Sequence, residues 1–159
     1  PGVYFQGHFG GIMEKTMIKL KELEPVIRKI LSEGGTFVFA PKGNSMQPFI
    51  WQGKDQVVLG ALPEGKLKKY QIVLYKRENG AYVLHRIIKV KKDSYTMRGD
   101  NQFQKEKGIR KEQMIGVVVG IICDGKEQKL DNIAGRSKVR IWVKTAFLRR
   151  VCRKILDFL

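Results

Sequence analysis

Three residue types that can cooperate in nucleophilic hydrolysis occur along this chain in the order Ser45, His85 and Asp100. Ser45 lies in Gly43–Pro48 (GNSMQP), a glycine-containing turn that follows an apolar run. Glycine lets another part of the backbone approach closely, and the turn could direct backbone N–H groups, including that of Ser45, at a negatively charged oxygen. A serine in such a turn is usually only a turn residue. Ser45 is therefore a candidate nucleophile only in combination with a base.

His85 is the candidate base. It lies within an otherwise apolar run, Val83–Ile88, and its imidazole titrates near neutral pH, so it could accept the proton of a serine hydroxyl. The alternative is a partly buried structural histidine, the commoner role of a lone strand histidine. Asp100, in Arg98–Asn101 (RGDN), could orient the imidazole and stabilise its cation, or it could serve only the turn.

The elements that must position these residues are mostly strands. Short strand-like runs follow one another with no helical pattern between them, which favours a mainly β chain of the α+β kind with antiparallel, coiled sheets. Turns are expected at Glu78–Gly80 and Lys91–Asp93. The expected strands are Thr36–Pro41, Gln56–Leu59, Ile72–Lys76, Ala81–Val90, Ser94–Arg98, Met114–Cys123 and Gln128–Leu130.

A helix is expected before the strands. Apolar residues recur at helical spacing within Glu14–Leu31, and Gly34-Gly35 would end the helix. Pro25 lies inside this stretch, so either the helix is kinked there or a second helix begins there.

A second helix is expected at the end of the chain, over Lys138–Leu159. Apolar residues lie on one face of this helix and basic residues lie mostly on the other. Two interpretations stay open. The apolar face packs on the β domain or on a second copy, which we favour, or the helix lies on an anionic membrane surface.

The chain divides into four parts. Residues 1–12 resemble a tag remnant and linker because they contain YFQG followed by glycines, so we exclude them, with His8, from the fold and take Met13 as the natural start. Residues 13–35 are helical, residues 36–131 form the β domain and residues 138–159 form the basic helix. Cys123 and Cys152 indicate neither a disulfide framework nor a zinc site, so no metal or cofactor is expected.

The charge is strongly positive. Thirty-one Lys and Arg residues against 15 Asp and Glu give a net charge of +16, which attracts anions such as nucleic acid, lipid headgroups or acidic peptides. No apolar run of about 18 residues is present, so neither a transmembrane helix nor a secretory signal peptide is expected. A soluble or peripherally membrane-associated protein is expected, and we favour the cytoplasm.

The combination of motifs resembles a known family. GNSMQPFI, WQGKDQVVL, IVLYK, YVLHRIIKV and YTMRGDNQ resemble, in this order, the conserved boxes of the signal peptidase I and LexA-type serine peptidase superfamily. The resemblance covers Thr36 to Ile121. It implies the coiled antiparallel sheets of that fold and a small signal-peptidase-like serine peptidase.

The resemblance also implies roles for individual residues. Ser45 matches the nucleophile, and its backbone N–H would bind the oxyanion. His85 matches the general base, as in signal peptidases of the endoplasmic-reticulum type, and Asp100 matches the Asp of the Gly-Asp-Asn box. Gly43 stands where many bacterial members have a serine that supplies a second oxyanion donor. The acidic pair that often follows the Gly-Asp-Asn box is absent, since Gln102–Lys107 reads QFQKEK.

The implied reaction is peptide-bond hydrolysis through an acyl-enzyme on Ser45. The substrate, a signal or leader peptide, would bind in an extended conformation, with Met46 and Pro48 as substrate-binding residues. Two other functions stay open. One is a catalytically inactive module of the same fold that binds a peptide or a partner. The other is a nucleic-acid-binding protein, which the charge alone suggests and no motif supports. The sequence indicates no oligomeric state.

Overall fold

The fold is known from a computed structural model that describes residues 2–5, 16–129 and 133–146. Met13, Cys152 and the last thirteen residues of the expected C-terminal helix, 147–159, lie outside the described residues.

The central feature is an eight-stranded antiparallel sheet, which confirms the mainly β expectation. Its strands pair in the order β3-β4-β9-β5-β6-β7-β8, and β10 pairs with β9. The strands are β3 Phe37–Phe39, β4 Asp55–Gly60, β5 Ile72–Lys76, β6 Tyr82–Val90, β7 Tyr95–Arg98, β8 Glu106–Ile109, β9 Met114–Cys123 and β10 Lys126–Lys129.

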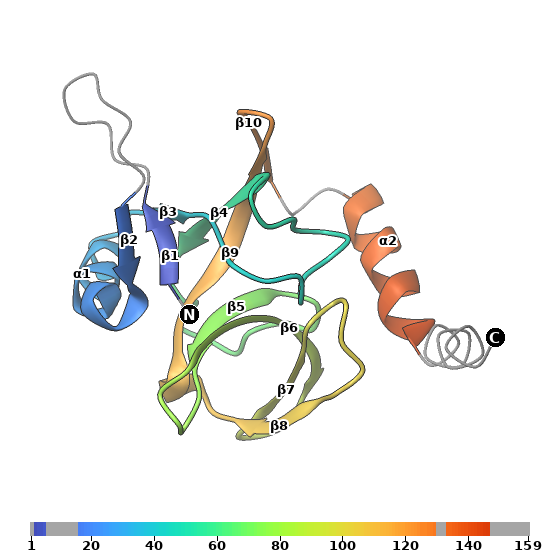
Figure 1. The fold of residues 1–159 in the computed structure, drawn as a ribbon. Helices are drawn as coiled ribbons and strands as arrows, with labels where there is room; N and C mark the ends of the chain where they lie inside the picture. Colours follow the sequence, from blue (N-terminus) through green and yellow to red (C-terminus); the bar gives the residue numbers. More distant parts are fainter. Residues whose placement is uncertain (1, 6–15, 130–132, 147–159) are drawn as a thin grey trace.

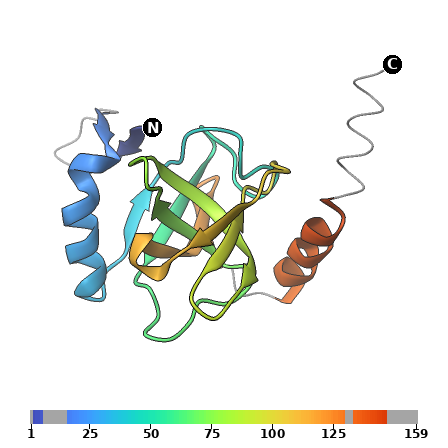
Figure 2. The same ribbon diagram turned by 90° about the horizontal axis from the view of Figure 1, so that it is seen from below.

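The sheet coils strongly, so β5 to β8 curve around their own core (Figures 1 and 2). Side chains alternate across β5: Ile72 and Leu74 belong to one buried cluster, while Val73 and Tyr75 belong to the other. β5 is therefore covered on both faces. Val73 pairs with His85 of β6, which places the histidine on the Tyr75 side of the sheet.

Strand β8 is the strand of the eight-stranded sheet that the sequence pattern missed. Its residues, EKGI, are polar and contain glycine, so they lack the alternating apolar pattern of the other strands. The segment forms a strand by pairing with β7, with Met97 opposite Glu106. It is the last strand in the order β3-β4-β9-β5-β6-β7-β8, a position where charged residues are common because they discourage further pairing.

The N-terminal part differs from the expectation in two ways. Gly2–Phe5 forms strand β1 and pairs with β2, Thr16–Lys19, so these four residues take part in the structure although residues 1–12 were excluded from the expected fold; that residues 1–12 are a tag remnant stays a prediction. Helix α1 covers Leu20–Ser32 and begins later than expected, because residues 16–19 are taken by β2. One helix runs through Pro25, so no second helix begins there.

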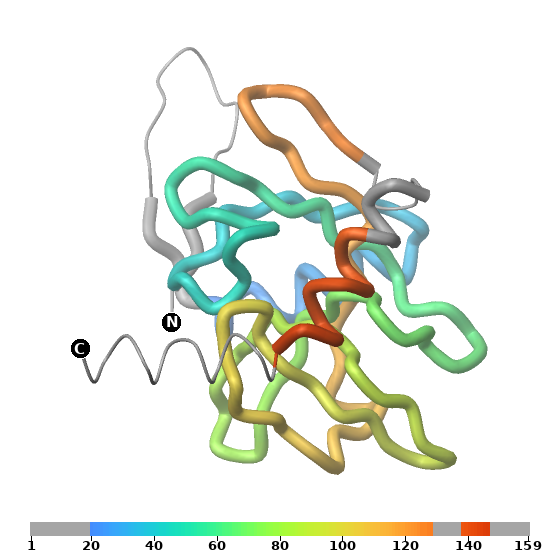
Figure 3. The backbone as a smooth tube through the Cα atoms, turned by 90° about the vertical axis from the view of Figure 1, so that its right-hand side faces the viewer, coloured from blue at the N-terminus to red at the C-terminus, as the bar shows by residue number. Residues whose placement is uncertain are grey.

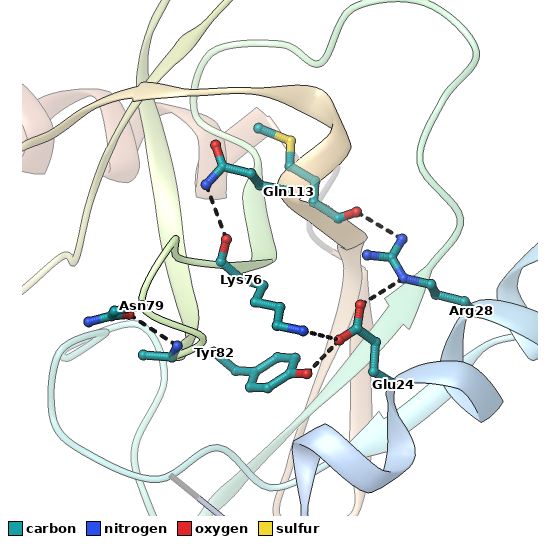
Figure 4. A network of polar contacts seen from close by, with 8 residues as sticks. Glu24, Arg28, Lys76, Asn79, Tyr82 and Gln113 are labelled. Carbon is teal, nitrogen blue, oxygen red and sulfur yellow. Dashed lines mark hydrogen bonds and ion pairs between the residues drawn. The ribbon is translucent and has the colours of Figure 1, made fainter.

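Helix α1 is fixed to the sheet by a polar cluster around Glu24 (Figure 4). Its carboxylate accepts hydrogen bonds from Arg28 of the same helix and from Lys76 and Tyr82 of the β5–β6 hairpin. Beside this cluster, Ile27 of α1 is fully buried in the core. The hairpin that carries Lys76 and Tyr82 therefore has a firm support on one side.

Helix α2, Ile133–Lys144, packs beside the β domain (Figures 1 and 3). The indole N–H of Trp142 donates to the carbonyl of Asp100 at 2.8 Å, and the Trp142 ring meets Phe49 edge to face. This supports the packing interpretation for the described part of the helix; membrane binding stays a prediction. Neither helix of the described chain is long and apolar enough to cross a membrane.

Candidate active site

Ser45 lies in the long connection between β3 and β4, called here the serine loop, residues 41–54. Gly43 in this loop has a φ of 92°, a conformation that L residues with side chains rarely adopt. The Gly-Asp-Asn turn, residues 99–101, is hydrogen-bonded to this loop. The amide of Asn101 donates to the carbonyl of Ser45 at 2.8 Å, and its side-chain amide donates to the carbonyl of Asn44 at 3.3 Å.

His85 lies on β6 with 2% of its surface exposed. Its Nδ1 is 3.1 Å from Oε1 of Glu106 and 3.3 Å from the hydroxyl of Tyr75. Two other side chains fix the carboxylate of Glu106. The Tyr75 hydroxyl donates to it at 2.8 Å, and Arg77 donates to both oxygens, from Nε at 2.8 Å and from Nη2 at 2.5 Å.

This arrangement selects one tautomer of the imidazole. The Tyr75 hydroxyl has a single proton and gives it to Glu106, and an ionised carboxylate can only accept. Nδ1 of His85 must therefore carry the proton that points to Glu106. The lone pair is then on Nε2, as general-base chemistry at a serine requires.

Burial sets the titration of this group. It lowers the pKa of His85 to about 4, because desolvation disfavours the imidazolium; Glu106 opposes that shift and Arg77 adds to it. Burial by itself would raise the pKa of Glu106, but the hydrogen bonds from Arg77 and Tyr75 outweigh it and leave that pKa lowered. Burial and Glu106 together raise the pKa of Tyr75. At neutral pH the cluster therefore contains a neutral imidazole beside an anionic carboxylate.

Nε2 of His85 and Ser45 lie on the same side of this cluster. A Cβ atom at Gly99 would lie 2.7 Å from the carbonyl oxygen of Ser45 and 3.0 Å from Nε2 of His85. Glycine is therefore the residue that lets the serine loop and the imidazole approach one another here. Within the described residues, no hydrogen bond joins the Ser45 hydroxyl to His85, a common situation in active sites without substrate.

Ser45 and His85 line one partly open pocket of about 200 Å³. The pocket combines an apolar floor, two basic residues and the two candidate reactive residues. Its lining residues are Pro41, Lys42, Gly43, Ser45, Met46, Ile50, Arg77, Tyr82, Val83, Leu84, His85 and Gln102. The serine and the imidazole therefore border the same cavity.

Asp100 does not occupy the position that the sequence suggested. Its carboxylate forms a buried, bidentate ion pair with Arg86, with Nε to Oδ1 at 2.8 Å and Nη2 to Oδ2 at 2.6 Å. Both oxygens are used by that guanidinium, so Glu106 is the carboxylate at the imidazole. Sequence reasoning missed Glu106, because it lies in a lysine-rich segment with no acidic neighbour.

The oxyanion donors can be assigned from the backbone. The amide of Gly43 is used, since it donates to Oε1 of Gln52 at 2.5 Å. The amide of Ser45 donates to no group within the described residues. The expected donor at Ser45 is thus available, and Gly43 supplies no second one.

The two expected substrate-binding residues are placed differently. Met46 is 4% exposed and lines the pocket. Pro48 is exposed and is not part of the lining, and its carbonyl accepts a hydrogen bond from the indole of Trp51 at 3.0 Å. Of the pair, Met46 is in a position to contact a peptide bound beside Ser45.

No group of His, Cys, Asp and Glu side chains that could hold a metal ion occurs within residues 16–129 and 133–146. Comparisons of the chain with protein-family models, with curated proteins and with solved structures return no significant match.

Proposed function

We propose that this chain is a serine peptidase of the signal-peptidase-like kind, with Ser45 as nucleophile and His85 as general base. The observation that carries the proposal is the shared pocket. Ser45 and His85 come from distant parts of the chain and line one cavity, with the lone pair of the imidazole on Nε2. Glu106 takes the role of the orienting carboxylate, and Asp100 keeps a structural one.

The reaction would follow the usual order for acyl transfer. The Ser45 hydroxyl oxygen attacks the peptide carbonyl carbon while its proton moves to Nε2 of His85. The tetrahedral intermediate collapses, the C–N bond breaks, and the imidazolium returns the proton to the leaving amine. His85 then takes a proton from water, whose oxygen attacks the ester carbon on Ser45; the bond to the Ser45 oxygen breaks, the imidazolium returns the proton to that oxygen, and the carboxylic acid is released. Glu106 stabilises the imidazolium in both halves, and the Ser45 amide donates to the oxyanion.

The proposal includes the specific fold, the coiled sheets of the signal peptidase and LexA-type superfamily. The order of the elements supports it. The serine loop follows β3, the histidine lies on β6, and the Gly-Asp-Asn turn follows β7. This is the order of the boxes on which the resemblance rests.

A non-catalytic module that binds a peptide in the same pocket is the second candidate. One observation favours it: the Ser45 hydroxyl and the imidazole are not hydrogen-bonded within the described residues. On this alternative the pocket binds an extended peptide and the peptide bond stays intact.

The test is the intact mass of the protein after treatment with a serine-reactive acylating probe. We expect one adduct on the wild type, none on Ser45→Ala and slow formation on His85→Ala. Ser94→Ala is the matched control, because Ser94 is a half-buried turn serine outside the pocket lining, and it should react like the wild type. No adduct on well-folded wild type, or an adduct that survives Ser45→Ala, would overturn the peptidase proposal.

A further inference from the structure

We propose that the pocket beside Ser45 recognises a peptide that carries an acidic side chain next to a small or apolar one. The inference concerns the substrate class and rests on the proposed function for its chemistry. Its binding part can be tested without turnover.

The charges of the residues that line the pocket favour an acidic ligand. Two lining residues are cationic, Lys42 and Arg77, and none of the lining residues, all within the described chain, carries a carboxylate. Glu106 lies outside the lining, and its oxygens are engaged by Arg77, Tyr75 and His85. An acidic group entering the pocket would therefore meet the guanidinium of Arg77 and the positive charge of Lys42, with no carboxylate among the lining residues.

Arg77 has N–H donors left to bind a carboxylate of the ligand. A guanidinium has five N–H donors, and Arg77 gives one from Nε and one from Nη2 to Glu106. Its side chain is 38% exposed and lines the pocket, so the remaining donors can reach a ligand. Arg77 is held in place by Glu106, which lowers the entropy that ordering a free arginine would cost. This makes it a fixed anchor for a carboxylate.

The lining also contains an apolar floor that can accept an apolar side chain. Met46, Ile50, Tyr82 and Leu84 line the same pocket and are each at most 9% exposed. Glu24 accepts a hydrogen bond from the hydroxyl of Tyr82, which fixes that part of the floor (Figure 4). A cavity of about 200 Å³ accommodates a small or medium apolar side chain beside the basic residues. The combination predicts an apolar residue and an acidic residue close together in the peptide.

The experiment measures binding to the Ser45→Ala protein by fluorescence polarisation. The probes are dye-labelled alanine octapeptides in which a single Glu, Gln or Lys is placed at each position in turn. We expect one or two positions where the Glu peptide binds about fivefold more tightly than the Gln peptide, the scale of a partly exposed ion pair, and where the Lys peptide binds more weakly. No difference between Glu and Gln at any position would overturn the inference.

Variants of the two basic lining residues test whether they cause the preference for the Glu peptide. Lys42→Glu and Arg77→Gln should each reduce the Glu-over-Gln ratio, and Lys42→Glu should favour the Lys peptide. Lys92→Glu is the matched control. Lys92 is an exposed lysine in the connection between β6 and β7, outside the pocket lining, so this variant changes the net charge equally and should keep the ratio. A ratio that falls as much in Lys92→Glu would assign the preference to the overall charge and overturn the pocket assignment.

The two proposals can fail separately. A Glu preference in Ser45→Ala, together with a wild type that forms no acyl adduct, would leave an acidic-peptide-binding module and overturn the peptidase. Acylation of Ser45 with equal binding of Glu, Gln and Lys peptides would support the peptidase and overturn the acidic preference.

Discussion

Oε1 of Glu106 lies 3.1 Å from Nδ1 of His85, and the same oxygen accepts a hydrogen bond from Arg77. The carboxylate therefore fixes the orientation and the tautomer of the imidazole while its own position is fixed by the guanidinium.

Replacing Glu106 by Gln should reduce the rate of Ser45 acylation by about 100-fold or more, because the imidazolium loses its stabilising anion and the tautomer is no longer fixed. The rate is measured by the time course of adduct mass. Glu112→Gln, an exposed acid a few residues further along the chain, is the control and should react like the wild type. A Glu106→Gln protein that is folded and equally reactive would show that Glu106 is not the orienting group.

The pH dependence of acylation should show a low-pH limb. Only neutral His85 can accept the serine proton, and burial lowers its pKa to about 4, so the rate should stay level through neutral pH and fall to half near pH 4. Because the pKa of this histidine is lower in the folded than in the unfolded chain, acidification from about pH 6.5 toward pH 4 also destabilises the fold. The rate is therefore measured where circular dichroism shows native protein. A limb near pH 6.5 would contradict the burial of His85.

Replacing Asp100 by Asn should destabilise the protein by about 3–5 kcal/mol, because Arg86, which is 3% exposed, would keep a buried charge without its partner. Urea unfolding measures the loss. The double variant Arg86→Gln/Asp100→Asn should recover part of it. In conditions where Asp100→Asn is folded, its acylation should stay within about tenfold of the wild type, well above that of Glu106→Gln. Equal losses of acylation would place Asp100 in the catalytic group.

Adding a methyl group at Gly99 should separate the serine loop from the imidazole. The new Cβ would lie 2.7 Å from the Ser45 carbonyl oxygen, so the loop must move. We expect a loss of about 1–3 kcal/mol and a large drop in acylation. Gly65→Ala is the matched control, because a Cβ there meets no heavy atom within 4 Å. Normal acylation of Gly99→Ala would mean that the close approach is not required.

The sequence predicted the elements whose pattern is dictated by burial. β5 and β9 were predicted with their exact bounds, because both are continuous apolar runs. β8 was missed because its strand depends on pairing with β7 and not on its own residues. The predicted start of α1 was wrong because residues 16–19 form a strand that pairs with Gly2–Phe5. Local helical spacing does not reveal that pairing.

The candidate site shows the same division. Ser45 and His85 were singled out by residue type and motif, and the structure brings them to one pocket. The partner of the imidazole could not be predicted, because two carboxylates compete for two basic groups. Asp100 forms an ion pair with Arg86, and Glu106 lies between Arg77 and His85. Which acid pairs with which base depends on the register in which β6, β7 and β8 pair, and no residue pattern specifies that register.

The hydrogen bond from the amide of Asn101 to the carbonyl of Ser45 can form only after the chain has been synthesised as far as Asn101. During synthesis the serine leaves the ribosome well before the Gly-Asp-Asn turn, and before the strands that carry His85 and Glu106. The nascent chain therefore holds an ordinary, unactivated serine. If Ser45 is the nucleophile that we propose, its reactivity would arise only when the later segments reach the loop, and a growing or incomplete chain would then be protected from cutting itself or its neighbours.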